Sequence, residues 1–329
     1  MNLERKYNDI LLSLEQEKEE KNRLFKDLEN LKLHFSELEA TNNHLIAATW
    51  RERDLKKKLS ETIEELKTTR QIVESQNKRI TESINYARKI QLAINPTEAD
   101  LKNYYNDSFI FYSPKDVISG DFPWIFNTDD YLYVAAVDCT GHGVPGAMMS
   151  MIGNLLLNDI VNDGNILLPS QILRKLHLSV VQTLKQNFSD SNSNDGMDMG
   201  LCRIDKKNKQ IIFSGAHRPL FFLRNGVVTI YSGNKFPIGG MHYKGMNNFS
   251  DEHIDFTNGD TIFLFTDGLP DQIGGEEKRK LMTKTIKTFL EEVSTDDMQT
   301  IKEKSINYYQ SWKGNHKQID DVLLMGIRF

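Results

Sequence analysis

The chain has 329 residues, enough for one large domain or two ordinary ones. Its net charge is −5, and residues 1–95 carry 18 Lys and Arg against 17 Asp and Glu, so the negative charge lies in the remainder. This distribution argues against nucleic-acid binding, which usually requires a basic patch. The two cysteines, Cys139 and Cys202, have no metal-ligand spacing and are typical of a reducing compartment.

No apolar run approaches the ~18 to 20 residues that cross a membrane, so we expect no membrane span. The first ten residues, MNLERKYNDI, are charged and lack the apolar core of a signal peptide. We therefore expect a cytoplasmic protein. A chain cut from a larger membrane sensor would have the same composition, and an upstream sensor is therefore a partner to consider.

Residues from about 10 to 94 contain no Gly and no Pro, which predicts one long helix. Alternating steps of four and three residues from Leu24 to Ile94 find apolar side chains at 14 of 21 positions, which we call the seam. Such a heptad repeat predicts a coiled coil about 105 Å long. A homodimer follows, because a lone helix cannot bury its seam. Polar seam residues, such as Asn42, Arg70 and Asn77, are typical of positions that set register.

Pro96 ends the helical pattern, and short apolar runs alternate with turns beyond it. We expect residues 1–96 to form a coiled coil with a linker helix, and residues 97–329 to form the second domain. The strand candidates are 108–112, 131–138, 199–205, 210–215, 219–226, 227–233, 261–268 and 321–329, with an aromatic strand after Asp121. Helices are expected near 145–161, 170–187, 276–292 and 297–311. Adjacent hairpin strands predict an α+β domain with antiparallel sheets and helices packed outside.

Carboxylates stand where strongly apolar runs meet turns. Asp138 ends the run YLYVAAVD, Asp267 ends TIFLFTD, Asp121 precedes the aromatic strand, and Asp320-Asp321 open the last strand. Such strand ends can meet at one sheet edge, where unpaired carboxylates would repel one another. Divalent cations relieve that repulsion, and oxygen ligands completed by water are typical of Mg²⁺ and Mn²⁺ sites. Two such ions can activate a shared water and hold a phosphate, which predicts hydrolysis of a phosphate ester.

The segment VAAVDCTGHGVPGA (134–147) contains the most informative of these carboxylates. Asp138 is followed by a turn rich in glycine and then by the small-residue helix start Pro145-Gly146-Ala147. Taken alone, Asp138 is equally well interpreted as a residue that begins a turn or caps the next helix. The repetition of the pattern at the other strand ends favours a metal ligand.

Seven ordered segments resemble the metal-dependent protein phosphatase (PPM) family, in its bacterial SpoIIE-like, RsbU-like branch. They span about 105–329: SPKDVISGDF (113–122), VAAVDCTGHGVPGA (134–147), DGMDMGLCRID (195–205), SGAHRPLFFLRNG (214–226), FPIGG (236–240), LFTDGLPDQ (264–272) and QIDDVLLMGIRF (318–329). The resemblance implies an α-β-β-α sandwich with two Mn²⁺ or Mg²⁺ ions at one edge. It also implies a protein-serine/threonine phosphatase acting on a regulatory phosphoprotein, usually of STAS type, in partner-switching signalling.

Carried over by position, the resemblance assigns the following roles. Asp138 bridges both metals and is the central catalytic group, and the backbone carbonyl of Cys139 binds the first metal. Asp267 and Asp320 bind the second metal, and Asp121 lies near it. Asp321 orients ligands. Apart from the resemblance, Asp195 and Asp198 are interpreted either as turn-forming residues or, from their acidic spacing, as accessory ligands of a third, weaker metal position.

Two histidines and two basic residues near these motifs each have a functional and a structural interpretation. His142 is either a general acid for the leaving oxygen or a turn residue. Arg218 and Lys115 either bind phosphate or are solvated, and His217 either touches substrate or packs the loop. At the level of the whole chain, the alternatives are a non-catalytic scaffold and a hydrolase of small phosphate esters. The coiled coil is expected to regulate the activity.

Overall fold

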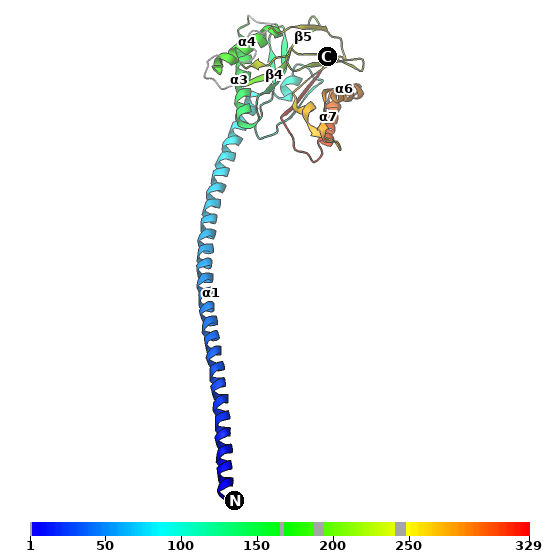
Figure 1. The fold of residues 1–329 in the computed structure, drawn as a ribbon. Helices are drawn as coiled ribbons and strands as arrows, with labels where there is room; N and C mark the ends of the chain where they lie inside the picture. Colours follow the sequence, from blue (N-terminus) through cyan, green and yellow to red (C-terminus); the bar gives the residue numbers. More distant parts are fainter. Residues whose placement is uncertain (1, 165–167, 187–193, 241–247) are drawn as a thin grey trace. The chain divides into compact units, whose positions relative to one another are not determined.

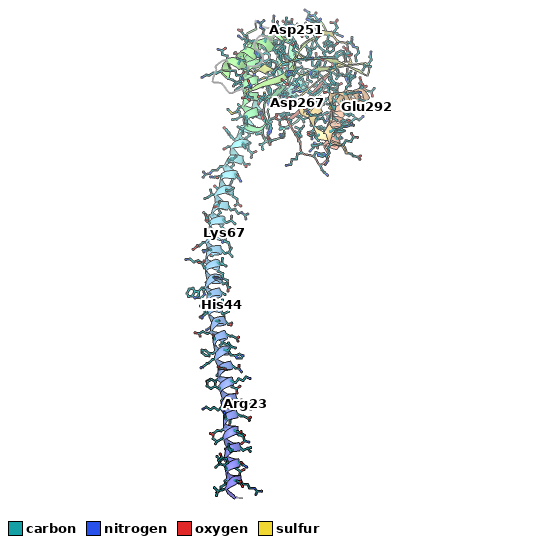
Figure 2. All side chains as sticks on the ribbon, viewed as in Figure 1. Arg23, His44, Lys67, Asp251, Asp267 and Glu292 are labelled. Carbon is teal, nitrogen blue, oxygen red and sulfur yellow. The ribbon has the colours of Figure 1, made fainter. Side chains whose placement is uncertain are left out.

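The computed structural model describes residues 2–164, 168–186, 194–240 and 248–329. It separates into two compact units, residues 1–79 and 80–329. The helix α1 (Asn2–Ile94) forms the first unit and continues into the second, so the predicted long helix is confirmed. Its seam is exposed along the single chain: Leu24, Leu31 and Leu66 are 63%, 67% and 67% exposed. In Figure 2 the side chains of this unit, Arg23, His44 and Lys67 among them, stand out from a bare helix.

Besides a small two-stranded hairpin, the described residues of the second unit form two large antiparallel sheets. The first has the order β2-β3-β4-β5-β9, and β8 pairs with β4. Its strands are β2 (Phe122–Asn127), β3 (Leu132–Cys139), β4 (Gly196–Asp205), β5 (Gln210–Ala216), β8 (Ile238–Gly239) and β9 (Glu252–Asp255). The second has the order β1-β13-β10-β6-β7. Its strands are β1 (Ser108–Ser113), β6 (Leu220–Arg224), β7 (Val227–Tyr231), β10 (Thr261–Phe265) and β13 (Val322–Arg328).

Helices cover the outer face of each sheet. α3 (Gly143–Asn162) and α4 (Pro169–Thr183) pack on the first sheet, and α6 (Thr283–Glu292) and α7 (Met298–Lys313) pack on the second (Figure 1). The predicted α-β-β-α sandwich is therefore confirmed. The short α2 (Glu98–Lys102) begins at a capping box in which Thr97 and Asp100 exchange hydrogen bonds.

The alternation of side chains along β3 explains why its sequence is apolar throughout. Tyr133, Ala135 and Val137 face the helices, whereas Leu132, Val134 and Ala136 face the second sheet. A strand buried on both faces needs apolar residues at every position. Asp138 is the first residue of this run that reaches the edge of the sandwich, which is why the carboxylate follows the apolar segment directly.

Two sequence-based predictions need adjustment. The helix expected at 276–292 begins at Thr283, because residues 273–280 form a small hairpin of β11 (Ile273–Gly274) and β12 (Arg279–Lys280). Positive φ at Lys278 and Met282 is incompatible with helix there. The helix expected at 170–187 ends at Thr183, and residue 187 lies outside the described residues.

The helix α3 qualifies the expectation that no segment is apolar enough to cross a membrane. It is long and apolar enough to cross a membrane by length and composition, and half of that window is buried inside the unit. Its buried residues, such as Met149 and Leu157, pack on the first sheet, as expected of a core helix.

Candidate metal centre

The antiparallel arrangement brings the predicted carboxylates to one edge of the sandwich. Asp138 is paired in register with Asp198, so the end of β3 and the start of β4 present their carboxylates side by side. On the facing sheet, Asp267 follows β10 and Asp320 precedes β13, which is the neighbour of β10. The end of one antiparallel strand lies beside the start of the next, so residues distant in sequence meet here.

A cavity of about 250 Å³ opens at this edge. It is lined by four of these carboxylates, by Arg218 and by the glycine-containing turn after β3: Asp138, Cys139, Thr140, Gly141, Met197, Asp198, Arg218, Pro237, Asp267 and Asp320. Figure 2 labels Asp267 within the unit. Four carboxylates among the lining residues suit a hard cation, or a phosphate group held by one.

Arg218, in the turn between β5 and β6, is central to this edge. Its Nη2 lies 3.0 Å from Asp138 Oδ2, 3.0 Å from Asp198 Oδ2 and 2.7 Å from Asp267 Oδ2. Burial lowers the pKa of Arg218, but Asp138 and Asp267 outweigh burial, so the net pKa is raised and the guanidinium stays charged. The arginine that the sequence offered as a phosphate ligand thus already binds carboxylates.

Asp121 is a buried neighbour of Asp138 and does not line the cavity itself. It is 3% exposed, and its Oδ2 is buried without a hydrogen-bond partner. Burial, followed by repulsion from Asp138, raises its pKa well above the ordinary value. A buried carboxylate oxygen without a donor is costly unless a cation completes the site.

Two other carboxylates show the same electrostatic tension. Burial, only partly offset by Arg218, raises the pKa of Asp138 to about 8. Burial is also the main cause that raises the pKa of Asp320, and Asp267 adds to it. Several carboxylates therefore share a region with too little positive charge, and elevated pKa values of this kind are typical of functional sites.

Asp321 has a different environment from its neighbour Asp320. It is 1% exposed, and its two oxygens accept hydrogen bonds from the backbone N–H groups of Lys115 (2.7 Å) and Gly120 (2.8 Å). Both oxygens are therefore engaged in holding the loop from 114 to 120 against the start of β13. The loop leads directly to Asp121, so Asp321 positions that carboxylate.

Close backbone packing fixes the turn after β3. A Cβ at Gly120 would lie 2.6 Å from the carbonyl oxygen of Gly141, and a Cβ at Gly146 would lie 2.2 Å from it. The loop before β2, the turn after β3 and the first turn of α3 therefore interlock through glycines. Cys139, whose carbonyl oxygen was predicted to be a metal ligand, lines the cavity within this interlocked turn.

The two candidate histidines, His142 and His217, each have a carboxylate partner. His142, the residue before α3, has its Nδ1 2.8 Å from Asp116 Oδ2, and both side chains are about half exposed. His217 has its Nδ1 3.0 Å from Asp198 Oδ1 and adopts a φ of +58°. Asp198 thereby binds His217 with one oxygen and Arg218 with the other. Asp116 is a residue that sequence reasoning missed, since nothing local connects it with His142.

Gln91, near the end of α1, also escaped notice. It is 5% exposed, and its Nε2 donates to the Ser119 carbonyl (2.7 Å) and to Ser150 Oγ (2.9 Å). Its Oε1 accepts from the Ser119 backbone N–H at 3.1 Å. The side chain therefore joins α1 to the loop before Asp121 and to α3. One signal was present: continuing the seam from Ala87 by four residues arrives at Gln91.

The donor set fits a divalent cation held partly by water. No three His, Cys, Asp or Glu side chains among the described residues are arranged as direct ligands of one ion. Mg²⁺ commonly uses only one or two carboxylates and keeps several waters, so such an arrangement is not required. The buried, unpartnered Asp121 Oδ2 and the three carboxylates around one Arg218 nitrogen both provide places for positive charge.

Comparison with known proteins points to one family. The profile of the family Stage II sporulation protein E (SpoIIE) matches residues 128–329. No curated protein sequence matches. Among solved structures, the SiaA-PP2C domain of Pseudomonas aeruginosa is similar at 28% identity with a TM-score of 0.70, over 77% of this chain and 98% of that one.

Two further structures resemble the fold. The PP2C phosphatase domain with a regulatory fragment of SpoIIE from Bacillus subtilis is 17% identical, with a TM-score of 0.53 over 68% of this chain and 61% of that one. The RsbU and RsbW domains of a Mycobacterium tuberculosis protein are 16% identical, with a TM-score of 0.53 over 67% of this chain and 59% of that one.

Proposed function

We infer the reaction from the family: the chain belongs to the SpoIIE family, and it is a metal-dependent protein-serine/threonine phosphatase. We propose that it removes phosphate from phosphoserine or phosphothreonine on a regulatory protein, of STAS type, in the cytoplasm. The observation that carries the proposal is the convergence of Asp138, Asp198 and Asp267 at a cavity beside the buried Asp121.

We assign the metal ligands as follows. Asp138 would hold both of two Mg²⁺ or Mn²⁺ ions, the Cys139 carbonyl would hold one, and Asp267 and Asp320 would hold the other, with Asp121 near them. When bound, the metals lower the pKa of water and neutralise charge on the phosphate. Asp321 is assigned a positioning role, and Asp198 remains an accessory candidate.

The chain's own residues position the reaction. The hydrogen bonds of Asp321 to the loop from 114 to 120 restrict the movement of Asp121. Asp116 orients His142 through the Nδ1 contact, which leaves Nε2 free to give a proton to the leaving serine oxygen. Such preorganisation lowers the barrier because the groups need not reorganise during the reaction.

A protein substrate is favoured over a small ester by exposed apolar residues close in sequence to the turn that lines the cavity. Val117, Val144 and Met148 are 44%, 48% and 62% exposed, and they lie close in sequence to Asp116 and His142. Exposed apolar residues beside a polar cavity are typical of a protein-docking rim. A small phosphate ester has too little surface to cover such a rim.

The test compares two substrates of the full chain with MnCl₂: a purified phosphoserine STAS protein and p-nitrophenyl phosphate. We expect Met148→Glu to raise KM for the phosphoprotein about tenfold and to leave the aryl ester unchanged. Leu155→Glu is the matched control, since Leu155 is 60% exposed on the same helix, two turns beyond. Equal effects of Met148→Glu on both substrates, or no phosphate release from any phosphoprotein, would contradict the proposal.

We also propose that the chain is a homodimer through α1 and that α1 regulates the phosphatase. Gln91 supports the second point, because its amide joins the end of α1 to the Ser119 backbone, two residues before Asp121. A rotation or shift of α1 would therefore pull on the loop that carries a metal ligand. The exposed seam supports the first point.

Insertions upstream of Ile80 test this regulation. Seven inserted residues preserve the heptad register, whereas four rotate the seam by roughly 50° relative to the catalytic unit at 3.5 residues per turn. We expect the four-residue insertion to change the rate on the phosphoprotein and the seven-residue insertion to leave it within about twofold. Equal rates in both would reduce α1 to a dimerisation element.

A further inference from the structure

Arg218 has the contacts of a bound cation rather than of a structural arginine. Three carboxylate oxygens, one each from Asp138, Asp198 and Asp267, lie within 3.0 Å of its single Nη2 atom. Its Nε is buried and has no hydrogen-bond acceptor. An arginine held for structure usually binds a carboxylate through two parallel hydrogen bonds. Convergence on one nitrogen is the pattern that carboxylates adopt around a metal ion.

We propose that Arg218 and a divalent cation compete for the same oxygens of Asp138 and Asp267, so that this arginine sets the metal affinity of the centre. The proposal rests on the metal-ligand roles assigned above under the proposed function. Arg218 acts through those carboxylates and is therefore a positioning residue. Metal binding requires the guanidinium to release Asp138 and Asp267.

Asp198 keeps the displaced guanidinium close. It binds Arg218 Nη2 through Oδ2 and His217 Nδ1 through Oδ1, and it is itself fixed opposite Asp138 in the β3–β4 ladder. The guanidinium can therefore leave the two metal ligands while Asp198 still holds it. A positive charge that stays nearby continues to oppose the metal, which makes binding weaker than the carboxylates alone would give.

The competition predicts two effects of opposite sign. Without Arg218, the clustered carboxylates repel one another, so the protein without added metal should be less stable. For the same reason it should bind a divalent cation more tightly. If Arg218 were purely structural, its removal would lower both stability and metal affinity. If it bound only phosphate, its removal would leave metal affinity unchanged.

The experiment measures Mn²⁺ binding to the full chain by isothermal titration calorimetry, with free Mn²⁺ counted by electron paramagnetic resonance. We expect the Kd for MnCl₂ to fall at least about tenfold in Arg218→Gln and to stay within about threefold in Arg218→Lys, which keeps the charge. Arg224→Gln is the matched control, because Arg224, at the other end of β6, also pairs with a buried aspartate, Asp260. An unchanged or higher Kd in Arg218→Gln overturns the proposal.

Asp138→Asn distinguishes a wrong metal-site assignment from a wrong competition hypothesis. If that variant binds Mn²⁺ like the wild type, the assigned metal site is wrong. If it loses Mn²⁺ while Arg218→Gln leaves the Kd unchanged, only the competition is wrong. Should Arg218→Gln fail to fold, wild-type protein labelled with ¹⁵N-arginine provides a second route. Titration with MgCl₂ should shift the Arg218 side-chain resonance, assigned by its absence in Arg218→Lys, and an unmoved resonance overturns the proposal.

Discussion

The two edges of the sandwich each contain an arginine bound to aspartate, at opposite ends of β6. At the edge away from the cavity, Arg224 binds Asp260 through Nε and Nη2, with Nη2 2.7 Å from Oδ2, and Nη2 also donates to the Asp255 carbonyl. Asp260 also accepts from the Thr257 backbone N–H and hydroxyl. At the cavity edge, one Arg218 nitrogen serves three carboxylates, and its Nε has no acceptor.

The difference separates a structural cluster from a functional one. Around Asp260 the charges balance and the hydrogen bonds are complete, and the pKa of Asp260 is lowered because its hydrogen bonds outweigh the effect of burial. Around Asp138 the carboxylates outnumber the cations, and burial raises the pKa of Asp138 to about 8. Completed pairs stabilise the fold, whereas an excess of buried negative charge marks the edge where a cation belongs.

The largest expected effect follows from removing a charge at the cavity edge. Asp138→Asn should lower Mn²⁺-dependent phosphatase activity at least about a hundredfold, because the carboxylate assigned to both metals is lost. The fold should persist, since the change removes an unfavourable buried charge. Phosphate release and circular dichroism check both points. Activity close to that of the wild type would show that the excess of carboxylates at this edge has another purpose.

The sequence predicted much of this edge because its signals are local. An apolar strand followed by an aspartate, as at Asp138 and Asp267, indicates both a buried strand and the end at which a carboxylate emerges. The sheets, the covering helices and the carboxylate positions could therefore be predicted.

The contacts between distant segments could not. Arg218 meets Asp138 across 80 residues, and Asp116 meets His142 across 26, and no periodicity connects such pairs. Only the register of the complete sheets brings them together. For that reason the sequence left Arg218 as a phosphate ligand or a solvated residue.

A second prediction concerns His142, which lies beside the charged edge but is about half exposed. His142→Gln should slow hydrolysis of a phosphoserine substrate about tenfold, because a serine alkoxide is a poor leaving group that needs a proton. The same variant should hydrolyse p-nitrophenyl phosphate at the wild-type rate, since that leaving group needs no proton. Equal slowing of both substrates would indicate that His142 only holds the turn.

At the opposite edge the expected effect is on stability. Asp260→Asn should lower the free energy of unfolding by about 2 kcal/mol at pH 7, because it weakens the hydrogen bonds of a buried carboxylate to Arg224 and to the Thr257 N–H and hydroxyl. Mn²⁺ binding should not change. Urea denaturation followed by calorimetry with MnCl₂ measures both quantities, and a loss of Mn²⁺ affinity would remove the distinction between the two edges.

The same pair has a defined pH dependence. Since the pKa of Asp260 is lowered in the folded state, its stabilisation is present above the unfolded value of 3.8 and is lost as the pH falls below it. The difference in unfolding free energy between the wild type and Asp260→Asn should therefore be constant from pH 7 to about 5 and shrink below about pH 4. A difference that grows with acidity would have the wrong sign.

The smallest expected effect on stability comes from Gln91, an uncharged and fully paired group at the charged edge. Its amide completes the hydrogen bonds of Ser119 from α1, so Gln91→Ala should cost about 1 to 2 kcal/mol of unfolding free energy. The phosphatase rate of the folded variant should also change, because the Ser119 loop, which Asp321 holds as well, leads to Asp121. Lys89→Ala, at an exposed position of the same helix, is the control. If both variants keep the wild-type rate, the two edges differ in chemistry alone, and α1 does not act on the centre through this contact.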